Sequence, residues 1–333
     1  MKVLVIGGGM YGCHIALSLK NKYIEVDLFE KNKELFLESS GKNQYRLHQG
    51  FHYARNYITR NQSKKGFDIF LNFYEEFTKR VSKNYYFVPK ENSLIDFGTY
   101  ISIFSNEKYD FEVLSKENFS FLNEIEGGFL VDERVIDVDG LREMFSEELR
   151  DVIKYESEVS PSELGVLKSK YDYIIDCTWG RLLKPFECKY ELTHLCYVKT
   201  KTKNHPAITL VDGPLWSLYP TSKDNIYTLS SVVNTPLFKD EDLDEILNYK
   251  SKLTEDYLLS NYDKMVVEVE KNYKKYRNEF SLEGHQISIK TKPIGNSDPR
   301  DCRIFKNDNV ISIFSGKIDT FYIAEDYINK LLK

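Results

Sequence analysis

A glycine-rich turn near the N-terminus is the part of this sequence that most clearly predicts chemistry. The run Gly7-Gly-Gly-Met-Tyr-Gly12 fits the pattern GxGxxG, with Gly7, Gly9 and Gly12 in the three glycine positions. The first glycine permits a tight turn, the second lets the backbone approach a pyrophosphate, and the third lets a helix pack close to a strand. Free N–H groups at the start of the following helix, near Met10 and Tyr11, suit phosphates. The spacing therefore predicts a dinucleotide site.

The elements around this turn complete the expected unit. Residues 2–6 are a continuous aliphatic run, typical of a strand buried on both faces, and residues 24–29 predict a second strand. The second run ends at Glu30, 18 residues after Gly12, where a carboxylate accepts hydrogen bonds from an adenosine ribose and disfavours a 2′-phosphate. The sequence has no GxxxxGK(S/T) motif, which excludes a Walker-type triphosphatase. The glycine pattern alone does not choose between FAD and NAD.

Two histidines within residues 39–55, a stretch rich in hydroxyl, amide and ring donors, are the candidate acid–base groups. His48 and His52 lie four residues apart. Imidazole, whose pKa is ordinarily about 6.5, can take an alcohol proton while hydride leaves the carbon. The alternative is that either ring bonds a cofactor phosphate or the backbone. Arg46 and Arg55 flank them, and a guanidinium suits a substrate carboxylate or a phosphate, although solvation at the surface is the ordinary role of each.

Composition excludes several classes of protein. The 333 residues suit two domains, and a net charge of −5 predicts no basic face for nucleic acid. Five cysteines have no paired or ligand-like spacing, which indicates reduced thiols in a cytoplasmic protein and no metal site. No apolar stretch approaches the roughly 18 residues that span a bilayer, and the apolar run after Lys2 is too short for a signal peptide. We expect a small-molecule substrate and leave the oligomeric state open.

The loop after the second predicted strand resembles a known flavoprotein family. Asn43, His48, Gly50 and the pair His52-Tyr53 match a spacing found in the D-amino-acid-oxidase-like (DAO) superfamily of FAD-dependent oxidoreductases. The loop is most similar to the branch that contains L-2-hydroxyglutarate oxidase, in which an aromatic residue stands at the position of His52. The resemblance implies that the cofactor is FAD, and that the loop passes its pyrophosphate and lies against the isoalloxazine.

Four later segments are similar to the same family. Residues 135–141 resemble the entry to a helix, and residues 173–180 resemble the strand that returns the chain to the FAD domain. Residues 290–298, with Lys292 in place of an arginine, resemble the approach to the last strand, and residues 310–320 resemble the closing strand–turn–helix. The resemblance implies that the last helix points its N-terminus at the pyrimidine edge of the flavin, where a helix dipole stabilises the anionic reduced form.

The glycine turn, the loop and the resemblance together give the residues expected at the site. We expect FAD to contact Gly7, Gly9, Met10, Tyr11, Gly12, Glu30, Lys31, Ser40, Asn43, Arg46, Leu47, Thr178, Gly180, Gly316, Lys317 and Ile318. We expect the catalytic residues to be His48, His52 and Arg46, and the substrate to contact Tyr53, Arg55, Tyr219 and Lys292. His14 and His194 are expected to have structural roles, and no metal ligands are expected.

The expected fold class is α/β, with a discontinuous Rossmann-type FAD-binding domain and an antiparallel-sheet substrate domain. The FAD-binding domain is expected at residues 1–75, 150–190 and 285–333, and the substrate domain at residues 76–149 and 191–284. Strand-like runs between polar turns indicate the second sheet; they are residues 87–88, 94–95, 100–104, 192–200, 207–211, 216–219 and 226–230. Residues 240–276 have a helical period.

These observations predict a FAD-dependent oxidoreductase that transfers a hydride from the CH–OH carbon of a small hydroxy acid or sugar-derived substrate to flavin N5. The two histidines favour the alcohol over an amine, because only the alcohol needs a base. An amine or amino-acid oxidase remains an alternative. So do a non-redox flavoprotein such as a sugar mutase, an NAD-binding protein without flavin, and a binding module that retains only the fold.

Overall fold

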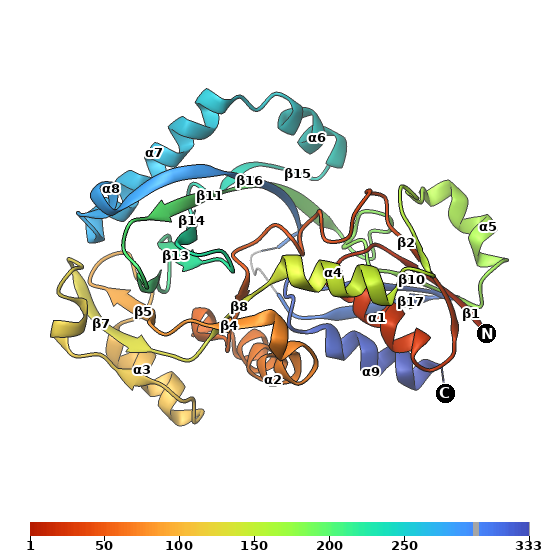
Figure 1. Cartoon of the computed structure of the whole chain (residues 1–333), viewed down its shortest axis with the longest axis horizontal. Helices are drawn as coiled ribbons and strands as arrows, with labels where there is room; N and C mark the ends of the chain where they lie inside the picture. Colours follow the sequence, from red (N-terminus) through yellow and green to blue (C-terminus); the bar gives the residue numbers. More distant parts are fainter. Residues whose placement is uncertain (296–299, 333) are drawn as a thin grey trace.

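The computed structural model describes residues 1–295 and 300–332. Residues 296–298, the end of one segment that resembles the DAO family, lie outside the described residues. Two large sheets divide the fold, and both chain termini lie beside the first of them (Figure 1). A third, small sheet of β3 (Arg46–Leu47), β8 (Arg134–Ile136) and β4 (Thr78–Arg80) carries the histidine loop next to the second sheet.

The first sheet is a parallel sheet with one antiparallel edge strand. Its order is β17-β18-β10-β1-β2-β9, and only β17 runs antiparallel to its neighbour. The strands are β1 (Lys2–Ile6), β2 (Glu25–Phe29), β9 (Ile153–Lys154), β10 (Tyr173–Asp176), β17 (Arg303–Asn307) and β18 (Val310–Phe314). The strands expected at residues 2–6 and 24–29 are therefore confirmed.

Both faces of the first sheet are buried, which explains its continuous aliphatic sequence. Val3 and Val5 pack with α1 (Met10–Lys20), α2 (Tyr57–Tyr74), α4 (Val138–Glu148) and α9 (Phe321–Leu331) on one face. Leu4 and Ile6 pack with α5 (Leu164–Lys168) on the other. Successive residues of a strand point to opposite faces, so this short run contributes to two separate cores.

The second sheet is mostly antiparallel. Its order is β15-β11-β14-β13-β12-β5-β7-β6, with β16 also paired to β11, and only β12 and β5 pair in parallel. The strands are β5 (Asn84–Pro89), β6 (Glu112–Val113), β7 (Ile125–Leu130), β11 (Cys188–Thr200), β12 (Ala207–Leu210), β13 (Trp216–Pro220), β14 (Ile226–Ser231), β15 (Pro236–Asp240) and β16 (Phe280–Pro293). Helices α6 (Leu243–Ser251), α7 (Glu255–Asn272) and α8 (Tyr276–Glu279) arch over its outer face (Figure 1).

One expected strand is a helix, and one expected run has no regular structure. Residues 100–104 lie in α3 (Phe97–Asn106), and residues 94–95 form no strand. The side chain of Asp96 caps α3 by accepting a hydrogen bond from the backbone N–H of Thr99 at 2.8 Å. Tyr100 and Phe104, one helical turn apart, then share a buried face that packs on Phe129. The short run at residues 100–104 does not by itself show a helical period, whereas Asp96 is a residue type that signals the start of a helix.

Two expected domain boundaries also differ from the structure. Leu141 and Phe145 of α4 are buried in the same core as β1 and α1, so α4 packs with the first sheet. Strand β16 pairs with β11 along its whole length and lies in the second sheet. The expected boundary at residue 150 places α4 in the substrate domain, although α4 packs on the first sheet. The expected boundary at residue 285 places most of β16 in the FAD-binding domain, although β16 lies in the second sheet.

Candidate functional site

A cavity of about 630 Å³ opens between the two large sheets. Its wall includes the turn after β1, the end of β2, residues 36–53, the turn after β10 and the segment between β18 and α9. Ligands of open α/β sheets bind at the carboxyl ends of the parallel strands, and this volume lies in the usual range for a ligand pocket. The cavity is therefore the candidate active site.

The glycine turn has the close backbone approach that the sequence pattern predicts. Gly7 has a φ of +104°, a conformation that favours glycine. A Cβ on Gly12 would lie only 1.9 Å from the carbonyl oxygen of Gly7, so the helix can pack on the turn only without a side chain there. A Cβ on Gly9 would lie 2.8 Å from the Oγ of Ser40, which also accepts the backbone N–H of Met10 at 3.0 Å. This turn fits a pyrophosphate.

Glu30 closes the turn at the end of β2. Its buried carboxylate accepts the backbone N–H of Gly8 at 2.6 Å and both the backbone and side-chain N–H groups of Asn32 at 2.8 and 2.7 Å. A carboxylate can accept about four hydrogen bonds, so capacity for a ribose hydroxyl remains on this cavity wall. Glu30 thus serves the turn and fits the nucleotide end of a cofactor.

The cavity is positive although the chain carries a net charge of −5. Its described wall contains the basic side chains Lys31, Lys42, Arg46, Arg181, Lys290, Arg300 and Lys317, and the acidic side chains Glu30, Glu38, Glu158 and Asp319. Basic groups therefore exceed acidic ones at this site. Such a field favours an anionic cofactor or substrate.

His48 lies beside Lys317 on the cavity wall. The Nε2 of His48 is 2.7 Å from the Nζ of Lys317, which also donates to the hydroxyl of Tyr53 and lies 4.0 Å from the centre of that ring. Burial, together with the charges of Lys317 and Arg46, holds the pKa of His48 well below its usual value. His48 is therefore a neutral imidazole at neutral pH.

His52 belongs to a different set of contacts. Its Nε2 lies 2.8 Å from Nη1 of Arg46, and its Nδ1 lies 2.8 Å from the hydroxyl of Tyr86. Tyr86 in turn donates to Glu133 at 2.8 Å. Burial, Arg46 and His48 hold the pKa of His52 well below its usual value. Both ring nitrogens of His52 thus have protein partners. Those of His48 do as well, because its Nδ1 accepts the backbone N–H of Gly50 at 3.1 Å and its Nε2 contacts Lys317. The partner at Nε2 of His48 is a flexible lysine side chain, which a ligand can replace more easily than the buried partners of His52.

Asp319 is a titratable group in the cavity that the sequence interpretation did not include. It lies just before α9, is buried, and contributes to the cavity wall. Burial raises its pKa to about 7, against the opposing charge of Lys317. Its Oδ1 has no hydrogen-bond partner within the described part of the chain. The family-like segment 310–320 contained this signal, because an acid stands directly before a predicted helix.

Most of the residues expected at the site lie on the cavity wall. Those are Gly7, Gly9, Met10, Tyr11, Glu30, Lys31, Ser40, Asn43, Arg46, His48, His52, Tyr53, Thr178, Gly316, Lys317 and Ile318. The structure thereby brings together segments from both ends of the sequence. Tyr11 connects two of them, because its hydroxyl donates to the carbonyl of Lys317 at 2.9 Å.

Six expected residues lie elsewhere, each with a partner that accounts for its position. Among the cofactor candidates, Gly12 lies beneath Gly7, Leu47 is buried in the first core, and the carbonyl of Gly180 accepts the hydroxyl of Tyr190 at 2.9 Å. Among the substrate candidates, Arg55 is exposed and pairs with Asp212, Tyr219 is buried with its ring 3.8 Å from the Arg46 guanidinium, and Lys292 pairs with Glu191 at 3.0 Å. None of these three is part of the described cavity wall.

Two other wall residues, Ser217 and Ser230, come from segments in which the sequence shows no local signal, and they join Gln44 of the histidine loop. Gln44, Ser217 and Ser230 form a hydrogen-bonded polar patch, in which Ser217 donates to Gln44 at 2.9 Å and lies 2.8 Å from Ser230. Ser217 and Ser230 come from the paired strands β13 and β14. Hydroxyl groups in an ordinary strand sequence do not reveal that they face a cavity.

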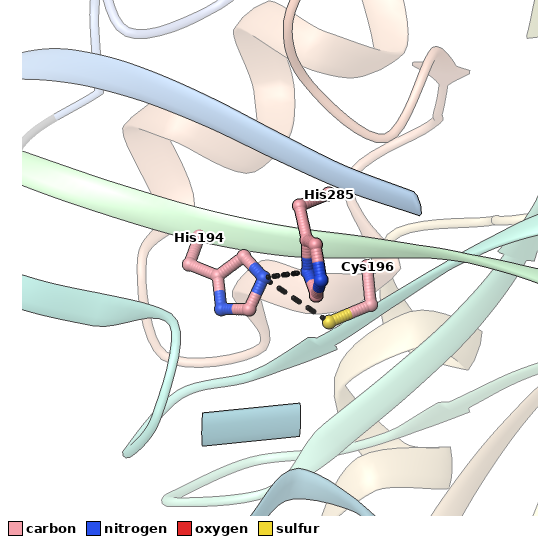
Figure 2. A group of neighbouring side chains, drawn as sticks. All are labelled: His194, Cys196 and His285. Atoms are coloured by element: carbon pink, nitrogen blue, oxygen red, sulfur yellow. Dashed lines mark hydrogen bonds between the residues drawn. The ribbon is translucent and has the colours of Figure 1, made fainter. Parts of the chain in front are cut away.

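A cluster of His194, Cys196 and His285 lies away from this cavity, where β11 and β16 pair (Figure 2). The Nε2 of His194 is 2.7 Å from the Nδ1 of His285 and 3.4 Å from the Sγ of Cys196. Asn261 donates through Nδ2 to the Nδ1 of His194 at 3.0 Å and to the carbonyl of Asn234 at 2.9 Å. His194 therefore keeps its proton on Nε2. A metal-binding imidazole has the reverse arrangement, so this cluster fits a hydrogen-bonded pair.

The helices of the described residues are all too short or too polar to cross a lipid bilayer.

Comparison with known proteins identifies relatives of this fold and sequence. Residues 2–228 match the family model described as FAD dependent oxidoreductase (DAO). The FAD-dependent monooxygenase FPY4 of Fusarium mangiferae is 36% identical over 334 residues, covering 98% of this chain and 90% of that protein. The mitochondrial L-2-hydroxyglutarate dehydrogenase of Caenorhabditis elegans is 30% identical over 76 residues, covering 22% of this chain and 18% of that protein.

Solved structures share the fold at low sequence identity. Glycine oxidase from Geobacillus kaustophilus has a TM-score of 0.71 at 10% identity, covering 99% of this chain and 93% of that chain. L-α-glycerophosphate oxidase from Mycoplasma pneumoniae, solved with FAD bound, has a TM-score of 0.70 at 16% identity, covering 97% of this chain and 92% of that chain. These similarities extend over both sheets.

Proposed function

Because the chain belongs to the DAO family of FAD-dependent oxidoreductases, we propose that it oxidises the CH–OH carbon of a small hydroxy acid or sugar-derived substrate. The glycine turn and Glu30 fit FAD, since the turn leaves room for a pyrophosphate and the acid faces the cavity. When bound, FAD supplies the acceptor for the hydride that leaves the substrate carbon. The first sheet would hold this cofactor, and the second would supply the substrate wall.

The contact between His48 and Lys317 carries this proposal. A neutral imidazole next to an ammonium group is a suitable pair for an alcohol. A substrate hydroxyl that takes the place of Lys317 beside the ring can give its proton to the imidazole, and the displaced ammonium stabilises the oxygen as negative charge develops. Tyr53 holds Lys317 in place through its hydroxyl. An amine substrate requires no such base, because a neutral amine already carries the lone pair that promotes hydride loss.

The remaining wall supports an anionic, hydroxyl-bearing substrate. The excess of basic side chains favours a carboxylate, and the guanidinium of Arg46 lies at the same wall as His48. The patch of Gln44, Ser217 and Ser230 offers both donors and acceptors to substrate hydroxyl groups. The described cysteines are all unpaired, which supports a reducing compartment such as the cytoplasm.

Anaerobic bleaching of the flavin tests the proposal with matched substrate pairs. Holoenzyme is mixed with lactate or alanine, and with glycolate or glycine, so that each pair differs only in a hydroxyl or an amino group. We expect the hydroxy acid of a pair to bleach the visible absorbance and the amino acid to leave it unchanged. In His48→Asn the rate of bleaching should fall by about 10²- to 10⁴-fold, the usual contribution of a general base. Bleaching by the amino acids alone would refute the proposal.

Oxygen insertion is a second candidate function, favoured by the 36% identity to a protein named FAD-dependent monooxygenase. An oxidase returns both electrons of the substrate to O₂ as hydrogen peroxide. A monooxygenase instead places one oxygen atom in the product and reduces the other to water, using two electrons from a reductant. Labelled ¹⁸O₂ distinguishes them, because only the second reaction leaves ¹⁸O in the organic product.

A further inference from the structure

We infer that Glu133 is a positioning residue that acts through Tyr86 to hold the proton of His52 on Nδ1, and thereby keeps the guanidinium of Arg46 at the cavity wall. The inference rests on the proposed function, in which Arg46 lies beside the substrate. Glu133 itself is fully buried and is not part of the described cavity wall, so any effect on substrate must pass through other side chains.

Glu133 is held by donors on both carboxylate oxygens. Its Oε1 accepts the backbone N–H of Gln49 at 3.0 Å. Its Oε2 accepts the Nδ2 of Asn84 at 2.9 Å and the hydroxyl of Tyr86 at 2.8 Å. Burial raises the pKa of Glu133, whereas Arg46 and these hydrogen bonds oppose that rise. The carboxylate thus gives Tyr86 a fixed acceptor.

The hydrogen bonds from Arg46 to Glu133 have only one consistent direction. A guanidinium can only donate, so the Nε2 of His52 must accept from Nη1 of Arg46. A neutral imidazole then carries its proton on Nδ1, where it donates to the hydroxyl of Tyr86. Tyr86 is left with its own proton to donate, and the carboxylate of Glu133 accepts it. This series of hydrogen bonds therefore runs from a buried cation to a buried anion. Nη1 of Arg46 also lies 3.2 Å from the Tyr86 hydroxyl, to which it can donate directly.

Removing the carboxylate of Glu133 should reverse the direction of the hydrogen bonds between Tyr86 and His52. Without an acceptor at residue 133, the Tyr86 hydroxyl turns to donate to Nδ1 of His52, and the imidazole proton moves to Nε2. Two donors, on His52 and Arg46, then face each other at the 2.8 Å contact, and the guanidinium must move away. Arg46 also contacts Thr209 at 2.7 Å and stacks on Tyr219, so its displacement changes the cavity wall.

The test is ¹⁵N NMR of holoenzyme labelled in histidine, with flavin bleaching by lactate and glycolate as the second measurement. We expect His52 of the wild type to carry its proton on Nδ1. In Glu133→Gln the amide oxygen must stay on the backbone N–H of Gln49, which cannot turn away, so the amide nitrogen faces Asn84 and Tyr86. Tyr86 then loses its acceptor, and we expect the proton of His52 to move to Nε2. The bleaching rate should fall about 10²-fold, the usual effect of displacing a positioning group by about 1 Å.

Two further variants separate positioning from simple support of the fold. Tyr86→Phe removes the link but keeps the carboxylate, and it should slow bleaching as Glu133→Gln does. It also removes the direct contact of the Tyr86 hydroxyl with Nη1 of Arg46 at 3.2 Å, so the position of the His52 proton in Glu133→Gln is the measurement that reports the path through His52. Asn84→Ala removes another partner of Glu133 but leaves the Tyr86 contact, so the proton of His52 should stay on Nδ1. A wild-type His52 protonated on Nε2, or an unchanged tautomer in Glu133→Gln, would overturn the inference. Failure of every hydroxy acid to bleach the wild type would instead overturn the proposed function, because the NMR measurement needs no substrate.

Discussion

Replacing Gly12 by alanine should destabilise the apoprotein and abolish FAD binding. The new Cβ would lie 1.9 Å from the carbonyl oxygen of Gly7 and 3.1 Å from its carbonyl carbon, whereas ordinary contact begins at 3.4 Å. Overpacking usually costs about 1–3 kcal/mol. Here the clash is with backbone, which cannot rotate away, so we expect the upper value of about 3 kcal/mol.

This cost can be converted into a change in melting temperature. The entropy of unfolding is about 2.1 cal/mol/K per residue, or about 0.7 kcal/mol/K for the 333 residues. A loss of about 3 kcal/mol therefore lowers the Tm by about 4 °C. Thermal unfolding followed by circular dichroism, on apoprotein, measures this value without the stabilisation that bound FAD adds. Quenching of flavin fluorescence on titration measures FAD affinity.

Two other glycines provide matched controls. A Cβ on Gly165, in α5, meets no atom within 4 Å, so Gly165→Ala should raise stability by roughly 0.5–1 kcal/mol. A Cβ on Gly9 meets only the side chain of Ser40, whose Oγ can rotate away, so Gly9→Ala should change the Tm of the apoprotein less than Gly12→Ala does but weaken FAD binding. The reasoning is refuted if Gly12→Ala melts at the wild-type temperature and binds FAD as tightly as the wild type does.

Three further predictions concern single side chains. Burial raises the pKa of Asp319 to about 7 from an ordinary 3.8; the folded state therefore holds the proton more tightly, and stability falls by up to about 4 kcal/mol as pH rises through this window. Asp319→Asn should flatten that fall in Tm measured against pH, and an unchanged slope would contradict the assignment. Arg60 is buried, pairs with Glu107 and donates to the carbonyls that follow His52. Arg60→Met should therefore lower the free energy of unfolding in urea by about 1.5–3 kcal/mol, because buried carbonyls lose a charged donor, whereas a loss below about 1 kcal/mol would show that the pair does not support this loop. Glu30→Ala should weaken FAD binding at least tenfold, because the amide of Gly8 loses a charged partner worth about 1.5–3 kcal/mol; equal affinity in a flavin titration would refute this.

Much of the first sheet could be predicted from the sequence because its signals are local. The strand at residues 2–6, the turn that begins at Gly7 and the acid at Glu30 are contiguous, and each depends on backbone conformation and neighbouring hydrogen bonds. The second sheet was predicted less completely. Residues 100–104 have strand-like composition, but the cap at Asp96 and packing against Phe129 stabilise a helix instead. Tertiary packing commonly overrides intrinsic preference in such short segments.

The candidate site shows the same division between local and long-range information. The spacing of His48 and His52 placed both in one loop, but nothing in that loop distinguishes their partners. His48 contacts Lys317, 269 residues away in the sequence, and His52 connects through Tyr86 to Glu133. Sequence similarity to a family located the general position of the site, but did not indicate that Glu133 belongs to it.

The sequence by itself determined the nucleotide turn and the expectation of a dinucleotide, because both are encoded within a few consecutive residues. The choice of FAD and the segments that approach it came from the resemblance to a family. Only the tertiary structure decided which imidazole is paired to an ammonium and which to a guanidinium, and that hydroxyls of Ser217 and Ser230 face the cavity. Those facts depend on how two sheets pack across a shared cavity. Burial and the direction of hydrogen bonds arise only once distant segments exclude water from one another.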